Sequence, residues 1–304
     1  MLHHYQSCRL CPRNCGVNRL EGETGFCGET AQLKIGAAVI HKGEEPPLTG
    51  KGGSGTIFIS GCNLGCSFCQ NYQISQEGLG KAVSPQEFAD ICAALCDKGA
   101  ENINIVTGSH VVPGIIEGLN AAREAGVTIP ALWNSSGYDS EEALELLRGY
   151  IDIFLPDLKT LNSAVADKFF NAPDYPDIAK AAVLKMIEMT EKTKNRIIIR
   201  HLILPGYLES TRSVLRWFAD NAKEHALLSL MTQYTPRLTL TSREMPSRFL
   251  SEEEYEIVLK TLDEFEIEDG FCQELVTGSD WLPDFKRSNP FSSELSAPVF
   301  TIQT

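Results

Sequence analysis

The sequence predicts an α/β fold, built as a partial (β/α)6 barrel behind a small cysteine-rich metal-binding segment. From residue 56 onward, short apolar runs of strand length alternate with longer stretches of helical periodicity. A strand that runs parallel to the preceding one needs a crossover of this kind, so the alternation favours a parallel sheet. Before residue 56 the chain shows little apolar periodicity but holds four of its ten cysteines. A chain of 304 residues is long enough for one barrel.

The expected barrel consists of six strand–helix units. The first helix begins at Ser84-Pro-Gln-Glu87, a capping box with proline at the first helical position, and Gly99 ends it. Ser251-Glu-Glu-Glu254 is a second capping box and begins the last helix. Because six units fall short of the eight in a closed barrel, we expect an open one. The expected strands are 56–60, 102–107, 129–134, 151–158, 196–204 and 226–233, and the expected intervening helices are 84–99, 112–125, 140–148, a long region ending near 194, and 210–221.

Three regions follow from this pattern. Residues 1–55 form the cysteine-rich metal-binding segment and a linker, and residues 56–275 form the barrel. Residues 276–304 are expected to be an irregular tail that packs on the barrel. The stretch 235–249 is also irregular and is expected to wrap across an opening or the flank of the barrel.

The composition narrows the possible partners. The net charge of −13 and the lack of clustered Lys and Arg argue against nucleic acid and against anionic membranes. No apolar run approaches the ~20 residues of a membrane helix, and the start of the chain does not resemble a signal peptide, so we expect a cytoplasmic location. Seven cysteines fall within the first 69 residues. In a reducing compartment such clustering indicates metal binding rather than disulfides.

A loop with three cysteines directly follows the first expected strand. Its sequence is Gly61-Cys62-Asn-Leu-Gly-Cys66-Ser-Phe-Cys69-Gln-Asn71. Cysteine thiolates are the usual ligands of iron–sulfur clusters. A cubane has four irons, so three thiolates leave one iron open to a bidentate small molecule, as catalytic zinc keeps an open position. The alternative is a structural zinc site or a set of unrelated core cysteines. Barrel active sites lie where this loop lies, at the carboxyl ends of strands.

The C-x3-C-x2-C spacing, with Phe68 before the last cysteine, resembles the signature of the radical S-adenosylmethionine (radical SAM) superfamily. The resemblance implies a [4Fe–4S] cluster whose open iron is chelated by the amino and carboxylate groups of S-adenosylmethionine. It also implies reductive cleavage to a 5′-deoxyadenosyl radical that abstracts hydrogen from a substrate, with an electron donor such as flavodoxin or ferredoxin. The cofactor supplies the hard chemistry, and the protein supplies orientation and the exclusion of water.

Further stretches resemble one branch of that superfamily, the one related to pyruvate formate-lyase activating enzyme. The branch implies an oxidoreductase that acts on an unidentified protein, peptide or small molecule. The stretches that carry this resemblance are Cys11-Pro-Arg-Asn-Cys15-Gly-Val-Asn-Arg19, Glu45-Pro46, Phe68–Asn71, Asn102–Thr107, Asn134-Ser-Ser-Gly137-Tyr138, Pro156-Asp157-Leu158-Lys159, Arg200-His201-Leu-Ile-Leu-Pro205-Gly206 and Gln233-Tyr234.

The resemblance implies roles for residues that follow the strands. Phe68 would lie against the adenine of S-adenosylmethionine. The segment from Thr107 through Ser109 to His110 occupies the place where related enzymes hold the methionine amino group with Gly-Gly-Glu, although the acidic residue is missing here. Asn134 and Ser136 stand where the relatives position the ribose and the carboxylate.

Asp157 and Lys159 match an Asp-Leu-Lys segment near the sulfonium and the carboxylate, and Arg200 could add a second cation for that carboxylate. In the related enzymes the equivalents of Asn134 and Asp157 also border a monovalent-cation site. The predicted catalytic residues are Cys62, Cys66, Cys69, Lys159 and Arg200, and the predicted cofactor-binding residues are Phe68, Gln70, Asn71, Thr107, Ser109, Asn134, Ser136, Asp157, Lys159, Arg200 and Gln233.

A second group of cysteines lies near the amino terminus. Cys8, Cys11, Cys15 and Cys27 have the spacing C-x2-C-x3-C-x11-C in a segment that lacks an apolar core. Four thiolates suggest a closed metal site that stabilises the segment in place of such a core. A structural zinc ion and an auxiliary [4Fe–4S] cluster both suit four cysteines.

The leading functional hypothesis is therefore a radical SAM enzyme, with the activation of a glycyl-radical enzyme as one form of its reaction. One alternative is the modification of a peptide or small molecule by the same chemistry. An alternative of another class is a non-catalytic iron–sulfur or zinc protein that carries electrons or mediates an interaction. An electron carrier has no need of polar residues such as Asn134, Asp157 and Lys159 around an open iron, which argues against this last alternative.

Overall fold

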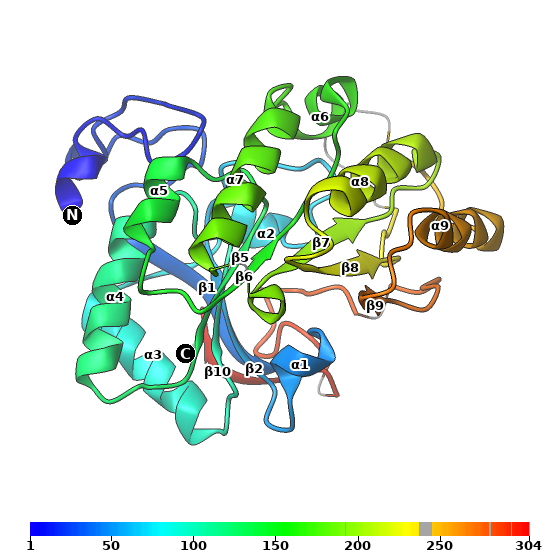
Figure 1. Cartoon of the computed structure of the whole chain (residues 1–304). Helices are drawn as coiled ribbons and strands as arrows, with labels where there is room; N and C mark the ends of the chain where they lie inside the picture. Colours follow the sequence, from blue (N-terminus) through cyan, green and yellow to red (C-terminus); the bar gives the residue numbers. More distant parts are fainter. Residues whose placement is uncertain (192, 237–244, 280, 293, 304) are drawn as a thin grey trace.

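The computed structural model describes residues 1–191, 193–236, 245–279, 281–292 and 294–303. Within these ranges a curved sheet forms the centre of the molecule, and helices cover its outer face (Figure 1). The α/β class and the mostly parallel sheet predicted from the sequence are confirmed. The residues expected to be irregular at 237–244 lie outside the described ranges. Among the described residues, no helix has the length and apolar character needed to cross a membrane.

Six strands run parallel around the barrel in chain order. The first four pair within one sheet, and the last two belong to a second parallel sheet that β9 extends. Two isolated parallel bridges, Phe154 with Ile197 and Asp157 with Arg200, join the sheets. The strands are β2 (Ser54–Ile59), β4 (Ile103–Val106), β5 (Ala131–Ser135), β6 (Ile153–Pro156), β7 (Ile198–Leu202) and β8 (Leu227–Met231), with β9 (Gly270–Cys272) beside β8.

The helices connect these strands over the outer face. Both predicted capping boxes form, because the Ser84 and Ser251 hydroxyls each accept the backbone N–H three residues on. The long helical region expected before residue 194 is two helices. Asn171 ends the first with a left-handed φ of +51°, and Pro176 lies in the first turn of the second, where its missing N–H costs nothing. The helices are α3 (Pro85–Asp97), α4 (Val112–Glu124), α5 (Glu141–Leu146), α6 (Ser163–Phe170), α7 (Tyr175–Met189), α8 (Leu208–Asn221) and α9 (Glu252–Glu264), with short α1 (Pro46–Thr49) and α2 (Tyr72–Ser75) and 3-10 turns at Leu2–Tyr5, Arg19–Glu21 and Lys194–Arg196.

An antiparallel extension flanks β2. The strand β1 (Leu33–His41) pairs with β2, with β3 (Lys81–Val83) and with β10 (Ser296–Thr301). No strand was predicted in either terminal region. Most of β1 is buried, on both of its faces. A strand buried on both faces lacks the alternation of polar and apolar residues that marks a strand in sequence. The three-region division stays a prediction.

Strand register brings the carboxyl ends of the parallel strands together. Phe58 pairs with Val106, Val106 with Asn134, and Asn134 with Leu155. The residues that follow these positions therefore lie along one edge, which we call the carboxyl rim. The opposite end of the barrel is filled by α1, whose Leu48 packs with Leu132, Leu155 and Ile198. Side chains at the carboxyl rim are thus the ones placed to form a site.

Candidate active site

The three-cysteine loop (residues 61–71) leaves β2 at the carboxyl rim. Its turns depend on two glycines, since Gly61 and Gly65 adopt φ of +79° and +68°. Glycine reaches this left-handed region without steric cost. The backbone N–H of Cys69 donates to the Cys66 carbonyl over 3.1 Å and closes a tight turn. Cys62, Cys66 and Cys69 therefore lie on one short loop next to the strand end.

The thiols of this loop are shielded from solvent. Cys66 is 8% exposed, and Cys62 and Cys69 are half-buried. The backbone N–H of Leu64 donates to Cys62 Sγ over 3.3 Å, and Cys69 Sγ lies 3.2 Å from the Ser75 hydroxyl. Burial raises the pKa of the Cys62 and Cys66 thiols. A metal that binds here has to displace protons that a buried thiol otherwise keeps.

Phe68 lies in an aromatic cluster beside the loop. Its ring meets the rings of Phe169, Phe170 and Tyr234 edge to face, with centroids 6.0, 5.8 and 6.1 Å away. Such edge-to-face pairs are favourable for the aromatic quadrupole. The predicted contact between Phe68 and adenine would therefore place the base against an aromatic wall drawn from three segments.

The next residues tie the loop to its surroundings. Gln70 Nε2 donates to the Gln233 carbonyl over 3.3 Å, so these two predicted cofactor-binding residues do lie together. Asn71 precedes α2, and its carbonyl accepts the backbone N–H of Ile74 and of Ser75. The structure thus gives Asn71 a backbone role at the start of α2, and its contact with a cofactor stays a prediction.

Asp157 and Lys159 form an ion pair just beyond β6. Lys159 Nζ lies 2.5 Å from Asp157 Oδ2, and the two side chains are 15% and 22% exposed. Burial by itself lowers the pKa of Lys159, but the Asp157 carboxylate outweighs it and raises that pKa. The buried Tyr175 hydroxyl accepts the Lys159 backbone N–H and lies 2.9 Å from the carbonyl oxygens of Ser136 and Asp157. Tyr175 holds this turn, and the sequence analysis did not single it out.

Arg200 points into the barrel and is held by two carboxylates. Its Nε donates to Glu45 Oε1 over 2.8 Å, and its Nη2 contacts both Glu44 and Glu45. Asn104 Nδ2 donates to Glu44 over 3.0 Å. The role of Arg200 as a second cation for the cofactor carboxylate stays a prediction. Glu44 was missed, because nothing in its neighbourhood in the sequence indicates that the chain before α1 reaches Arg200.

Ser109, in the segment after β4, is buried and its side chain binds a carboxylate. The Ser109 hydroxyl donates to Asp139 Oδ1 over 2.6 Å, and the Ser135 hydroxyl donates to Oδ2 over 2.6 Å. Trp133 Nε1 also donates to Asp139, which is 3% exposed. Burial raises the pKa of this carboxyl. The Ser109 hydroxyl is therefore hydrogen-bonded to the buried Asp139 carboxylate. Asp139 was not among the predicted site residues, although Asp139 follows the end of β5 by only four residues.

The other predicted residues at the strand ends have backbone contacts. Thr107 adopts a φ of +64°, and its N–H donates to the Asn134 carbonyl over 2.8 Å. The Ser136 hydroxyl accepts the backbone N–H of Tyr138 over 3.4 Å. His110 lies 2.8 Å from the Ser60 carbonyl, and burial lowers its pKa to about 3. The ring of His110 therefore contacts the backbone just before the three-cysteine loop.

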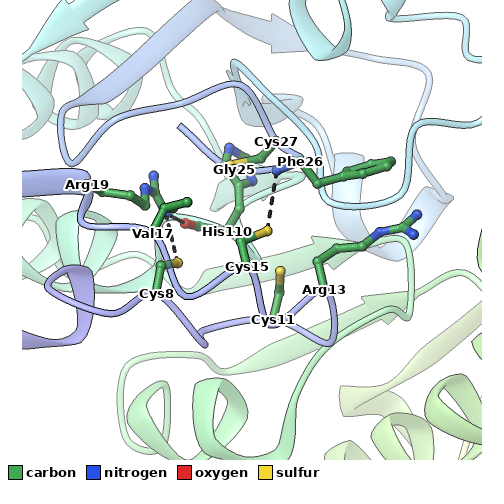
Figure 2. A pocket seen from close by; sticks show the side chains of 10 residues that line it. All are labelled: Cys8, Cys11, Arg13, Cys15, Val17, Arg19, Gly25, Phe26, Cys27 and His110. Atoms are coloured by element: carbon green, nitrogen blue, oxygen red, sulfur yellow. Dashed lines mark hydrogen bonds between the residues drawn. The ribbon is translucent and has the colours of Figure 1, made fainter. Parts of the chain in front are cut away.

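The amino-terminal cysteines gather around one pocket. Figure 2 shows Cys8, Cys11, Cys15 and Cys27 around it with Arg19 and His110. Burial raises the pKa of the Cys11 thiol to about 12 and also raises that of Cys27. Within the described residues, no three His, Cys, Asp or Glu side chains stand close enough together to ligate one metal ion.

Residues 56–218, more than half of the chain, match the sequence profile described as the Radical SAM superfamily. The chain belongs to the radical SAM superfamily. The matched residues begin at β2 and reach α8, so they include the three-cysteine loop and the carboxyl rim. Membership implies a [4Fe–4S] cluster and S-adenosylmethionine as cofactors.

Two archaeal proteins are similar to this radical SAM protein over most of its length. It is 30% identical to the uncharacterized protein MJ0674 of Methanocaldococcus jannaschii over 271 residues, which are 87% of this chain and 76% of that one. It is 25% identical to the uncharacterized protein MJ0808 of the same organism over 233 residues, 68% of this chain and 63% of that one.

Solved structures support the radical SAM fold. A radical SAM methyltransferase from Sphaerobacter thermophilus superimposes with a TM-score of 0.54 at 14% identity, over 73% of this chain and 67% of that one. The FeFe-hydrogenase maturase HydG from Carboxydothermus hydrogenoformans gives 0.51 at 15% identity, over 77% and 60%. At these identities the likeness shows the fold alone.

Proposed function

We propose that this chain holds a [4Fe–4S] cluster with Cys62, Cys66 and Cys69 and cleaves S-adenosylmethionine reductively to a 5′-deoxyadenosyl radical. That radical abstracts hydrogen from a substrate. The observation that carries the proposal is that the candidate cluster ligands and a candidate cofactor-binding cation lie at the same end of the barrel. Three shielded thiols on one loop share the carboxyl rim with the mostly buried ion pair of Lys159 and Asp157. A cluster site and a cation for the cofactor carboxylate therefore stand at the same end of the barrel.

The residues present fit such a cluster. The donor set is three thiols, which suits a cubane with one iron left for the cofactor. When bound, the cluster supplies the electron that breaks the bond between sulfonium and C5′. Lys159 offers a charge-assisted hydrogen bond to the cofactor carboxylate, and the Tyr175 hydroxyl fixes the backbone of that lysine. Phe68 and Tyr234 offer an apolar wall for the adenine and keep water from the reacting bond.

The subclass that we propose is related to the pyruvate formate-lyase activating enzyme, with generation of a glycyl radical in a partner protein as one form of the reaction. The support is the set of matching stretches in the sequence, which extend from Cys11 to Tyr234. Flavodoxin or ferredoxin is the proposed class of electron donor, and the cytoplasm is the proposed location. Modification of a peptide or small molecule is the second candidate. The buried Asp157–Lys159 pair beside the loop favours both over a simple electron carrier.

One anaerobic experiment tests the reaction. The protein is reconstituted with iron and sulfide and reduced with S-adenosylmethionine present, and 5′-deoxyadenosine is measured. We expect the wild type to form it, the Cys66→Ser variant to lose at least ~100-fold of the rate, and the control Cys96→Ser, on α3, to keep it. A wild type that holds its cluster but forms no 5′-deoxyadenosine would sink the enzymatic hypothesis. Transfer of label from a candidate substrate into 5′-deoxyadenosine would identify the hydrogen donor.

A further inference from the structure

The amino-terminal segment (residues 1–32) places positive charge next to its four thiols. Arg19 is 1% exposed, and one of its Nη atoms lies 3.7 Å from Cys8 Sγ. Its hydrogen bonds go to the carbonyls of Thr30 and His110, which carry no net charge. A buried guanidinium is costly unless a negative group lies nearby. The nearby Glu29 carboxylate pairs with Lys34 and compensates Arg19 only in part, so negative charge on the sulfur atoms in front of Arg19 would stabilise this buried guanidinium further.

Arg13 also lines this pocket, but its guanidinium points away from the four sulfur atoms and donates to carbonyls of the three-cysteine loop (Figure 2). The guanidinium lies 3.7 Å from the ring centroid of Phe26. Within the described residues neither Arg13 nor Arg19 has a carboxylate within ion-pair distance. Four thiolates around Zn²⁺ or around a [4Fe–4S]²⁺ core carry a net charge of −2. Arg19, next to Cys8 Sγ, would offset part of that charge.

The backbone is also arranged for charged sulfur. Phe26 N–H donates to Cys15 Sγ over 3.3 Å. A Cβ added at Gly25 would lie only 2.7 Å from the same sulfur, so the chain passes against this thiol as closely as glycine allows. Hydrogen bonds from backbone N–H groups to ligating sulfur tune and orient metal–thiolate sites. Donors from both side chain and backbone thus already face the pocket.

The same segment holds the three-cysteine loop. Arg13 Nε donates to the Asn63 carbonyl over 2.8 Å, and an Nη donates to the Leu64 carbonyl over 3.1 Å. A Cβ added at Gly61 would lie 3.0 Å from the Cys27 carbonyl oxygen, so the backbone just before Cys62 lies against the backbone at Cys27. A metal that restricts the motion of Cys27 and Arg13 therefore also restricts the motion of the three-cysteine loop.

We propose that Cys8, Cys11, Cys15 and Cys27 hold a four-thiolate metal centre of charge −2, offset in part by Arg19, and that this centre fixes the three-cysteine loop through Arg13 and Cys27. Zinc and a second [4Fe–4S] cluster share this ligand chemistry. Because the described side chains do not converge on a single-ion position, binding of either group has to draw the four thiols together. The effect on the loop rests on the proposed function, whereas the metal centre does not.

Metal analysis of anaerobically prepared protein tests the centre. The samples are the wild type, the double variant Cys11→Ser/Cys15→Ser, Cys66→Ser and the control Cys96→Ser. We expect the double variant to lose one zinc or about four irons while keeping the metal of the other site, and Cys66→Ser to show the reverse. Mössbauer spectra assign iron, and the absorption of cobalt-substituted protein assigns zinc. A double variant with the full wild-type metal content would overturn the proposal.

Arg13→Lys tests the effect on the loop with all seven thiols intact. Lysine keeps the charge but cannot form the several hydrogen bonds that the planar guanidinium makes. We expect the amino-terminal metal to remain, and the affinity for S-adenosylmethionine, followed by its effect on the EPR spectrum of the reduced first cluster, to fall about tenfold. The control Arg148→Lys, on the exposed surface beside α5, should stay within twofold of the wild type.

The outcomes separate the two proposals. An unchanged affinity in Arg13→Lys would overturn the effect on the loop. A wild type that holds the amino-terminal metal but yields no EPR response to S-adenosylmethionine would refute the proposed function and still support the four-thiolate centre. Circular dichroism of each variant shows whether the barrel remains folded.

Discussion

The three-cysteine loop and the amino-terminal segment place cysteines in two different settings. The loop extends from a buried strand, and its neighbours include the Phe169 carbonyl on α6 and the Ser75 hydroxyl on α2. The amino-terminal segment forms no strand of its own before β1, and its four thiols surround its own pocket. Three ligands on a rigid scaffold leave a coordination position open for chemistry, whereas four ligands close a site. Of the two regions, the one with less secondary structure around it therefore has the larger number of thiols.

The largest effect is expected from Lys159→Met in the loop region, which leaves the mostly buried Asp157 carboxylate without its partner. We expect a loss of roughly 3 kcal/mol in the free energy of unfolding, because a broken buried pair leaves an uncompensated charge. Urea denaturation of the wild type and the variant measures it. The double variant Asp157→Asn/Lys159→Met removes both charges and should recover part of the loss. If the double variant were less stable than Lys159→Met, the charge argument would be wrong.

Gly61→Ala tests the contact between the two regions. Alanine would strain a φ of +79° and would press its Cβ against Glu29, His110 and the Cys27 carbonyl. We expect a loss of about 2–3 kcal/mol in thermal or urea unfolding, together with weaker binding of S-adenosylmethionine.

Gly149→Ala is the matched control for this variant. Gly149 has the same φ of +79°, but nothing lies within 4 Å of an added Cβ. Its loss should be limited to the backbone strain of about 1 kcal/mol. Equal losses in the two variants would show that the packing of the amino-terminal segment against the loop contributes nothing.

The free energy of unfolding of the barrel is expected to depend on pH through His201. Burial lowers the pKa of this histidine to about 4, although it lies 2.8 Å from the Leu158 carbonyl. Because the unfolded chain binds a proton near pH 6.5 and the folded chain does not, stability is complete above pH 6.5 and falls as the pH drops toward 4. We expect the free energy of unfolding to fall by on the order of 1 kcal/mol per pH unit in that range. His201→Gln should flatten this part of the urea-midpoint profile, and an unchanged slope would contradict the assignment.

The smallest effect concerns a helix outside both cysteine regions. Ser84→Ala removes the side-chain cap of α3 and should cost about 1 kcal/mol in thermal unfolding. The metal content of both sites should not change. Loss of metal in this variant would mean that a lower overall stability is enough to release metal. The variants of the two cysteine regions would then have to be compared with controls of equal stability.

The sequence predicted those features that depend on neighbours along the chain. The caps at Ser84 and Ser251 and the spacing of Cys62, Cys66 and Cys69 are local patterns with a local physical cause. The alternation of strands and helices likewise predicted the parallel barrel, because each crossover is a continuous piece of chain.

The features that the sequence did not reveal depend on distant contacts. Glu44 meets Arg200 across 156 residues, and Arg13 meets Phe170 across 157. Asp139 accepts hydrogen bonds from hydroxyl groups near the ends of two strands, and these two strand ends lie together only because of the register of the sheet. β1 was not predicted because a strand buried on both faces shows no alternation of polar and apolar residues. In each case the partner, not the local pattern, decides what the residue does.

The pairing of β1 with β10 has a consequence for synthesis of the chain. β1 lies between β2 and β10 in the sheet, and residues 42–295 separate it from β10. The ribosome therefore releases β1 long before β10, and during that time one edge of β1 has unpaired backbone N–H and C=O groups. Exposed edges of this kind invite pairing with other chains. Because β10 is synthesised last, the nascent chain depends on another contact to cover the edge of β1 until then. A slow translation rate would lengthen the time for which that edge is exposed.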